Sequence, residues 1–152
     1  MFTGLWVEAK TDAGAYLSRR TKGLLNNIGG VAGQYRTPAI AAELLFYFSN
    51  TMQTSPYRGF GRPEATYIIE RLIDKAARQL GVDALALRQK NLIAPSQMPY
   101  QTGLTYSYDC GDFPKVVAAA ADEADYHGFA RRREHSEARG LLRGIGISNP
   151  VS

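Results

Sequence analysis

Residues 55–80, SPYRGFGRPEATYIIERLIDKAARQL, decide the fold of this chain. Their second half predicts a long amphipathic helix, because apolar side chains recur at the three- and four-residue spacing of one helix face. Pro63 suits the first turn of this helix, and Gly81 is placed to end it. The predicted apolar face consists of Ala65, Ile68, Ile69, Leu72, Ile73, Ala76, Ala77 and Leu80.

The loop that leads into this helix, residues 55–64, carries two arginines, two glycines and one phenylalanine. Glycine lets a backbone approach a partner closely, and a helix N-terminus favours an anion. Phe60 lies between the glycines, where an aromatic ring can stack on a planar ligand. The pattern lacks the Gly-Lys-Ser/Thr of a phosphate loop and the third glycine of a dinucleotide fingerprint. It therefore predicts either a ligand loop or a tight connection between a strand and a helix.

Upstream of the loop, the sequence predicts two strands separated by an irregular connection. Residues 5–7 form a short apolar run, and residues 44–48 are apolar and aromatic enough for a buried strand. A helix through the preceding alanines is the alternative for the second of these segments. Residues 23–33 contain four glycines and two asparagines, which is typical of a loop.

Downstream, capping residues mark three further helices. Asp83 is placed as the N-cap of a helix that ends near Leu92 and forms a hairpin with the first helix. Asp112 caps the next helix, and Gly128 separates it from a charged helix that ends near Gly140.

The remaining segments predict extended chain. Residues 94–111 read as a loop with at most one short strand around 104–108, in which Tyr100, Tyr106 and Tyr108 either line a pocket or pack in the core. Residues 141–152 resemble a strand that enters a sheet, but no later segment can pair with it. These elements predict an α+β fold with short strands, a helical hairpin and further helices, in which residues 1–152 form one partial domain.

Composition excludes several classes of protein. The 152 residues are 45% hydrophobic and 21% charged, which is ordinary for one globular domain. The net charge of +4 comes from an arginine cluster at residues 131–143 without interleaved aromatics, so a solvated helix face is favoured over a nucleic-acid surface. No apolar run is long enough for a membrane span, and no signal peptide is recognisable. We expect a cytoplasmic protein.

Cysteine and histidine give no metal-binding pattern. Cys110 is the single cysteine, which excludes an internal disulfide and fits a reducing compartment, and we expect it to be structural. His127 and His135 are eight residues apart on a polar segment, where surface positions are favoured over metal ligation. No serine, histidine and acid set for nucleophilic hydrolysis is recognisable.

Longer motifs resemble a known family. The run YRGFGRPEAT at residues 57–66, continued by LRQKNLI at 87–93, is similar to the large subunit of the molybdenum hydroxylases. This is the family of xanthine dehydrogenase, aldehyde oxidase and aerobic carbon monoxide dehydrogenase. The resemblance extends from DAGAYLS at residues 12–18 to RGIGI at 143–147 and covers nearly the whole chain.

The resemblance implies a part of a molybdopterin-binding domain. Arg58 and Gly59 are expected to contribute to the cofactor environment and Phe60 to contact the substrate, with no direct metal ligand from this chain. The implied cofactor is molybdenum-molybdopterin, expected as the cytosine dinucleotide. Iron-sulfur clusters and FAD are expected on a small and a medium partner subunit. The implied reaction inserts oxygen from water into a carbon–hydrogen bond.

Position 59 separates branches of that family. Copper-containing carbon monoxide dehydrogenases carry a cysteine in this loop as a soft ligand for copper, whereas this sequence has Gly59. The resemblance therefore implies an aldehyde or an N-heteroaromatic compound as substrate. Family subunits are several times longer and supply a glutamate base from a region with no counterpart here. We expect a fragment that has no catalytic residue and is inactive alone; the alternative is a non-catalytic helical binding or assembly module.

Overall fold

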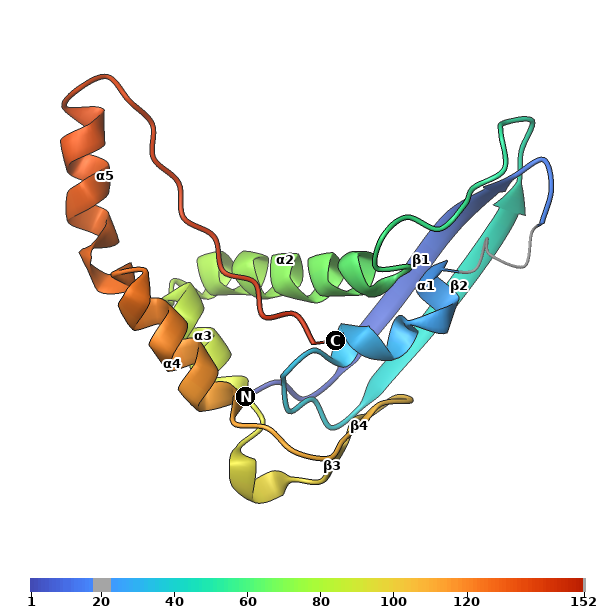
Figure 1. Cartoon of the computed structure of the whole chain (residues 1–152), viewed down its shortest axis with the longest axis horizontal. Coiled ribbons are helices and arrows are strands. Elements are labelled where there is room, and N and C mark those ends of the chain that lie inside the picture. The colour runs from blue at the N-terminus through green and yellow to red at the C-terminus, as the bar shows by residue number, and fades with distance from the viewer. Residues whose placement is uncertain (18–22, 152) are drawn as a thin grey trace.

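The structure is a computed structural model that describes residues 1–17 and 23–151 (Figure 1). Strands and helices are interspersed, so the α+β class predicted from the sequence is confirmed. The elements are β1 Leu5–Gly14, α1 Gly23–Asn26, η1 Ile28–Ala32, β2 Ile40–Phe48, α2 Arg62–Leu80, α3 Ala84–Asn91, η2 Pro95–Gln97, β3 Tyr100–Gln101, β4 Ser107–Tyr108, α4 Phe113–Glu123, η3 Tyr126–Gly128 and α5 Phe129–Glu137.

The two long strands, β1 and β2, form a parallel pair in which Leu5 lies opposite Ile40. Both predicted strands are present but longer than expected, and the helical alternative for the second is wrong. The expectation that residues 44–48 are buried is also wrong, since Tyr47 is 52% and Phe48 is 67% exposed. Parallel sheets are ordinarily covered on both faces, but here only two strands pair and the end of β2 extends beyond the helices (Figure 1).

Helix α2 is the centre of the fold, as the sequence predicts. Ala65, Ile69, Ile73 and Ala77 are buried along it, and Gly81 ends it in a left-handed conformation. The predicted apolar face is too wide, because Leu72 and Leu80 are exposed. These two residues lie at the edge of the stripe, where no described element covers them.

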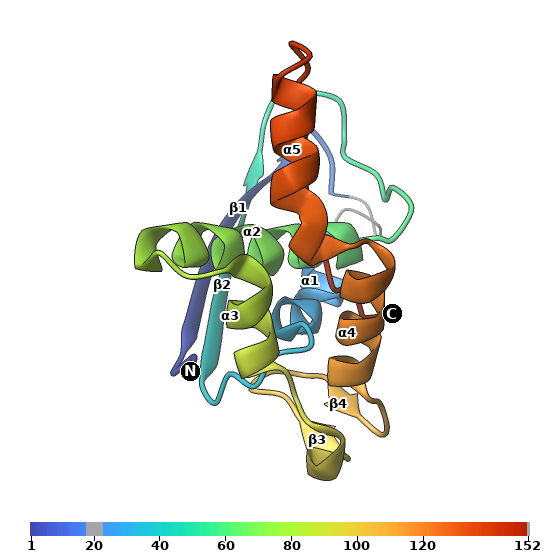
Figure 2. The ribbon, with the colours of Figure 1, turned by 90° about the vertical axis from the view of Figure 1, so that its left-hand side faces the viewer.

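The capping predictions are confirmed. The Asp83 carboxylate accepts a hydrogen bond from the Ala86 amide at 2.8 Å, so α2 and α3 form the expected hairpin. The Asp112 carboxylate accepts one from the Lys115 amide at 3.0 Å at the start of α4. Figure 2 shows α5 continuing from the end of α4, so that the two helices form an arm that extends away from the sheet. None of the helices in the described ranges is long and apolar enough to cross a membrane.

Two predictions of local structure are wrong. Residues 23–33 were expected to be irregular, but they contain α1 and η1, because Val31 and Ala32 are buried beside α2 and packing stabilises turns that glycine disfavours. Residues 141–151 form no strand. They run as an extended segment alongside α2 (Figure 1), where side chains rather than a neighbouring strand hold them. The short strands β3 and β4 fall within the predicted loop at 94–111.

Candidate functional site

The loop before α2 is a tight left-handed turn. The Phe60 amide donates to the Tyr57 carbonyl at 2.9 Å, and the Arg62 amide donates to the Gly59 carbonyl at 3.1 Å. Gly59, Phe60 and Gly61 have φ values of 97°, 43° and 94°. A positive φ is uncommon for a residue with a side chain, so the surrounding structure must hold Phe60 in place.

Gly59 cannot carry a side chain in this turn. A Cβ atom built on its backbone would lie 2.5 Å from both Cδ and Cγ of Pro63, the second residue of α2. Real contacts are never this short, so any substitution requires the backbone to shift. Pro63 of the same chain therefore gives a steric reason for glycine at this position.

Arg58, Gly59 and Phe60, the three site residues proposed from the sequence, lie in different surroundings. Arg58 is exposed to solvent, and Phe60 is half-buried. A Cβ built on Gly23 would lie 3.1 Å from the Phe60 ring, so this ring packs against the start of α1. The Phe60 carbonyl also accepts a hydrogen bond from the Asn27 side chain. Of the three residues, Gly59 alone lines the large groove described next.

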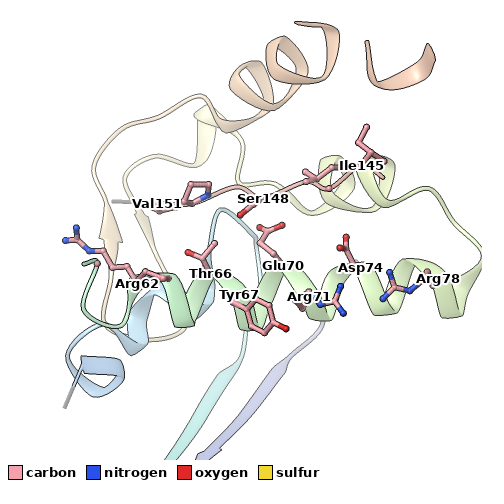
Figure 3. Close-up of a pocket in the computed structure, with 15 residues that line it drawn as sticks. Arg62, Thr66, Tyr67, Glu70, Arg71, Asp74, Arg78, Ile145, Ser148 and Val151 are labelled. Carbon is pink, nitrogen blue, oxygen red and sulfur yellow. The ribbon is translucent and has the colours of Figure 1, made fainter. Parts of the chain in front are cut away.

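The groove lies between α2 and the C-terminal segment and has a volume of about 690 Å³ (Figure 3). Thr66, Glu70 and Asp74 point from α2 towards this segment, whereas the Tyr67 ring points away from it (Figure 3). Its full lining is Gly59, Arg62, Pro63, Thr66, Tyr67, Glu70, Arg71, Asp74, Arg78, Ile145, Gly146, Ile147, Ser148, Pro150 and Val151. The groove thus begins at the loop and follows the helix.

A buried charge network forms the floor of this groove. The Arg88 guanidinium is completely buried; its Nε donates to Glu70 Oε2 at 2.8 Å, and its terminal nitrogen lies 2.9 Å from Asp74 Oδ1. Tyr35 donates its hydroxyl hydrogen to Glu70 Oε1 at 2.7 Å. Every strong polar group here has a partner, which is the condition under which burying charge is tolerated.

The same network fixes the C-terminal segment as the second wall of the groove. Arg88 also donates to the Ile147 carbonyl at 3.3 Å, and the Asn149 side-chain amide donates to the Tyr35 hydroxyl at 3.0 Å. Burial and the neighbouring Glu70 carboxylate raise the pKa of Tyr35. Burial alone would lower the pKa of Arg88, but Glu70 raises it, so the guanidinium stays charged. Its role is to hold the two walls together.

No sequence motif indicates this network. In the sequence, Arg88 stands out only as part of the LRQKNLI motif and Glu70 only as part of the predicted long helix. A signal existed, because Glu70 lies three residues before Ile73 and seven before Ala77 and therefore shares their buried face.

A second hollow of about 620 Å³ lies between Arg62 and the tyrosines of the β3–β4 region. Tyr108 is buried and donates its hydroxyl hydrogen to the Gly33 carbonyl at 2.8 Å, so it packs in the core and also lines this hollow with Tyr106. Burial, followed by the neighbouring Tyr106, raises the pKa of Tyr108 to about 12. Cys110 is exposed, and its hydrogen bond with Asp109 raises the pKa of the thiol.

The loop has features that fit one wall of a molybdopterin site. Within residues 1–17 and 23–151, the amides of Gly59 and Gly61 have no hydrogen-bond partner; Gly59 is exposed near the N-terminal end of α2, whereas Gly61 is buried. Arg58 and Arg62 are exposed beside them. An exposed amide and exposed guanidinium groups suit the phosphates of such a cofactor. No cluster of His, Cys, Asp and Glu side chains in the same part of the chain could hold a metal ion directly.

Comparisons with known proteins agree with this geometry. The family described as molybdopterin cofactor-binding domain matches residues 1–92. The gamma subunit of the 6-hydroxypseudooxynicotine dehydrogenase complex of Paenarthrobacter nicotinovorans is 32% identical over 151 residues, covering 95% of this chain and 19% of that subunit. The carbon monoxide dehydrogenase large chain of Afipia carboxidovorans is 43% identical over 91 residues, 56% of this chain and 11% of that one.

Solved structures share the fold. Quinoline 2-oxidoreductase from Pseudomonas putida 86 superimposes with a TM-score of 0.75 and 28% identity over 86% of this chain and 17% of that one. Reconstituted CO dehydrogenase from Oligotropha carboxidovorans gives a TM-score of 0.74 and 29% identity over the same shares. The fold is therefore that of a molybdopterin cofactor-binding domain. The chain belongs to the molybdopterin cofactor-binding domain family and spans about a fifth of the length of its first curated relative.

Proposed function

We propose that this chain is part of the large subunit of a molybdenum hydroxylase that oxidises a carbon–hydrogen bond of an aldehyde or an N-heteroaromatic compound, with water as the oxygen source. The observation that carries the proposal is the geometry of Gly59, where a Cβ would lie 2.5 Å from Pro63. A cysteine cannot occupy this turn without a backbone shift, so the loop has no place for a thiolate ligand to copper. The names of two similar proteins, a quinoline oxidoreductase and a nicotine hydroxylase subunit, support an N-heteroaromatic substrate.

Each loop residue has a proposed role toward the cofactor. Arg58 and the Gly59 amide bind and orient molybdenum-molybdopterin, expected as the cytosine dinucleotide, because both are exposed beside the N-terminus of α2. When bound, this group supplies two-electron oxidation and the oxygen atom taken from water. The accessible part of the Phe60 ring stacks on a planar substrate, and its packing against Gly23 holds the ring at a fixed angle.

We further propose that the chain is inactive alone and acts with an iron-sulfur subunit, an FAD-binding subunit and the remainder of the large subunit. Its coverage of about a fifth of the relatives' length supports this view. So do the exposed aromatic side chains of the β1–β2 pair: Trp6 near its start and Tyr47 and Phe48 at its end are all more than half exposed.

A loop graft tests the proposed chemistry. Residues 55–64 replace the corresponding loop in quinoline 2-oxidoreductase, once unchanged and once with Gly59→Cys. We expect the unchanged graft to retain molybdenum and to hydroxylate quinoline without oxidising carbon monoxide, and the Gly59→Cys graft to lose quinoline turnover. Carbon monoxide oxidation by the unchanged graft, or equal quinoline turnover by both grafts, would contradict the assignment.

A second candidate is the non-catalytic binding or assembly module. It is favoured by the closed network of Arg88, Glu70 and Asp74, whose members are all supplied by this chain. Cooperative unfolding of the 152-residue chain without cofactor would favour the module, and aggregation without a folding transition would favour the part of a larger subunit.

A further inference from the structure

A positively charged hollow, separate from the two described above, lies on the arm formed by α5 and the residues that follow it, remote from the loop of Arg58 (Figure 1). It has a volume of about 390 Å³ and is lined by Arg131, Arg132, His135 and Arg143. Each lining residue carries or can accept a positive charge, and no carboxylate belongs to the lining. Concentrating like charges is unfavourable unless an anion or solvent compensates them.

Specific contacts hold these side chains in place. Arg131 and His135 are four residues apart on α5, which directs both to the same face of the helix. Arg143 approaches this face because its Nε donates to Ser136 Oγ at 2.9 Å. Ser136 is only 4% exposed; its hydroxyl donates to the Arg132 carbonyl at 3.0 Å, and its own carbonyl accepts from the Leu141 amide at 2.9 Å.

The carboxylates near the hollow neutralise only part of its positive charge. Asp125 pairs with Arg132, and Glu137 pairs with Arg133 at 2.9 Å. Within the described part of the chain, Arg131 and Arg143 have no ion pair with a carboxylate. Glu134, the other acidic residue of α5, does not line the hollow. Two guanidinium groups are thus available for an external anion.

We propose that this hollow binds a phosphate-bearing anion of about the size of a diphosphate. Guanidinium groups bind phosphate oxygens through paired N–H donors, and several arginines around one concave site allow both phosphates to be contacted. A volume of about 390 Å³ lies at the small end of ligand pockets, which suits a diphosphate better than a folded polymer. The anion comes either from a free phosphorylated molecule or from a phospholipid headgroup.

Binding of inorganic pyrophosphate to the 152-residue chain, measured by isothermal titration calorimetry, tests the proposal. Arg131→Gln is compared with Arg133→Gln, because the two variants lose the same charge from neighbouring positions but Arg133 does not line the hollow. We expect Arg131→Gln to weaken pyrophosphate binding about tenfold, as for a charged hydrogen bond, and Arg133→Gln to change it less than about twofold. Equal weakening by both would overturn the site in favour of diffuse surface charge.

A third variant keeps the charge constant. Ser136→Ala removes the contact that positions Arg143, so it should weaken pyrophosphate binding while circular dichroism stays unchanged. Vesicles of phosphatidylcholine, with and without phosphatidylglycerol, distinguish the two sources of phosphate. Arg131-dependent binding to the phosphatidylglycerol vesicles alone identifies a headgroup, and Arg131-dependent binding to pyrophosphate identifies a free anion. No Arg131-dependent binding to either probe overturns the proposal.

Discussion

Replacing Arg88 by methionine removes the centre of the buried charge network without removing the bulk of the side chain. The substitution leaves the Glu70 carboxylate, whose side chain is only 6% exposed, with the Tyr35 hydroxyl as its remaining side-chain partner. It also frees Asp74 and the Ile147 carbonyl. Breaking a buried ion pair from one side costs about 3–5 kcal/mol, because the other charge stays buried and unpaired.

This cost is large compared with the free energy of unfolding of a typical domain, which is about 5–15 kcal/mol. At about 2–4 °C per kcal/mol for a chain of this size, Arg88→Met should lower Tm by roughly 6–20 °C. Urea and thermal unfolding of the 152-residue chain, followed by circular dichroism, measure both quantities.

The matched control is Arg133→Met, which breaks an exposed pair with Glu137 on α5. Exposed pairs of this kind contribute roughly 0.5 kcal/mol or less. The double variant Glu70→Met with Arg88→Met should be more stable than Arg88→Met alone, because it removes the unpaired charge. If Arg88→Met changes the free energy of unfolding no more than Arg133→Met does, the network does not hold the walls of the groove together.

Three further changes probe other parts of the fold. Gly59→Ala should destabilise the chain by about 1–3 kcal/mol in urea unfolding, because the new Cβ strains the backbone. Gly144 has open space around it, so Gly144→Ala should leave the free energy of unfolding unchanged. Equal effects of the two substitutions would show that the contact with Pro63 causes no strain. Asp83→Ala should cost about 1 kcal/mol at pH 7 through loss of the helix cap. Burial raises the pKa of Asp83, but hydrogen bonds from the Ala86 amide and the Tyr126 hydroxyl together lower it below its usual value in the folded state. The difference in free energy of unfolding between the wild type and Asp83→Ala should therefore shrink as acid protonates the carboxylate, and a constant difference down to low pH would contradict this reasoning. Burial raises the pKa of Tyr108 to about 12, so its contribution to the free energy of unfolding is complete below pH 10 and is lost as the pH rises towards about 12. Tyr108→Phe should reduce this loss of stability at alkaline pH. An unchanged alkaline unfolding transition would contradict the role given to Tyr108.

The sequence predicts best where local chemistry decides the structure. Helix α2 and the caps at Asp83 and Asp112 depend on spacing and on neighbouring amides, and all three are confirmed. Residues 141–151 carry strand-like residues but form no strand, because a strand also needs a neighbour to pair with.

The candidate site depends more on distant contacts. The glycine pattern around residue 59 predicts either a ligand loop or a tight connection, and the clash with Pro63 shows that the tight turn itself requires glycine. The packing of Phe60 against Gly23 and the pairing of Glu70 with Arg88 join residues 18 or more positions apart. No local pattern encodes such partners, so the sequence predicts the loop but not the floor of the groove.

The molybdenum content of a chimeric subunit tests the central claim most directly. In this chimera the present chain replaces the matching segment of the quinoline 2-oxidoreductase large subunit, and metal analysis gives the ratio of molybdenum to protein. The proposed function predicts near-stoichiometric molybdenum and bound pterin, both reduced when Arg58→Ala and Gly59→Ala are introduced together. A correctly folded chimera without molybdenum, or one whose molybdenum content is unaffected by these two substitutions, would contradict the assignment of the loop to the cofactor.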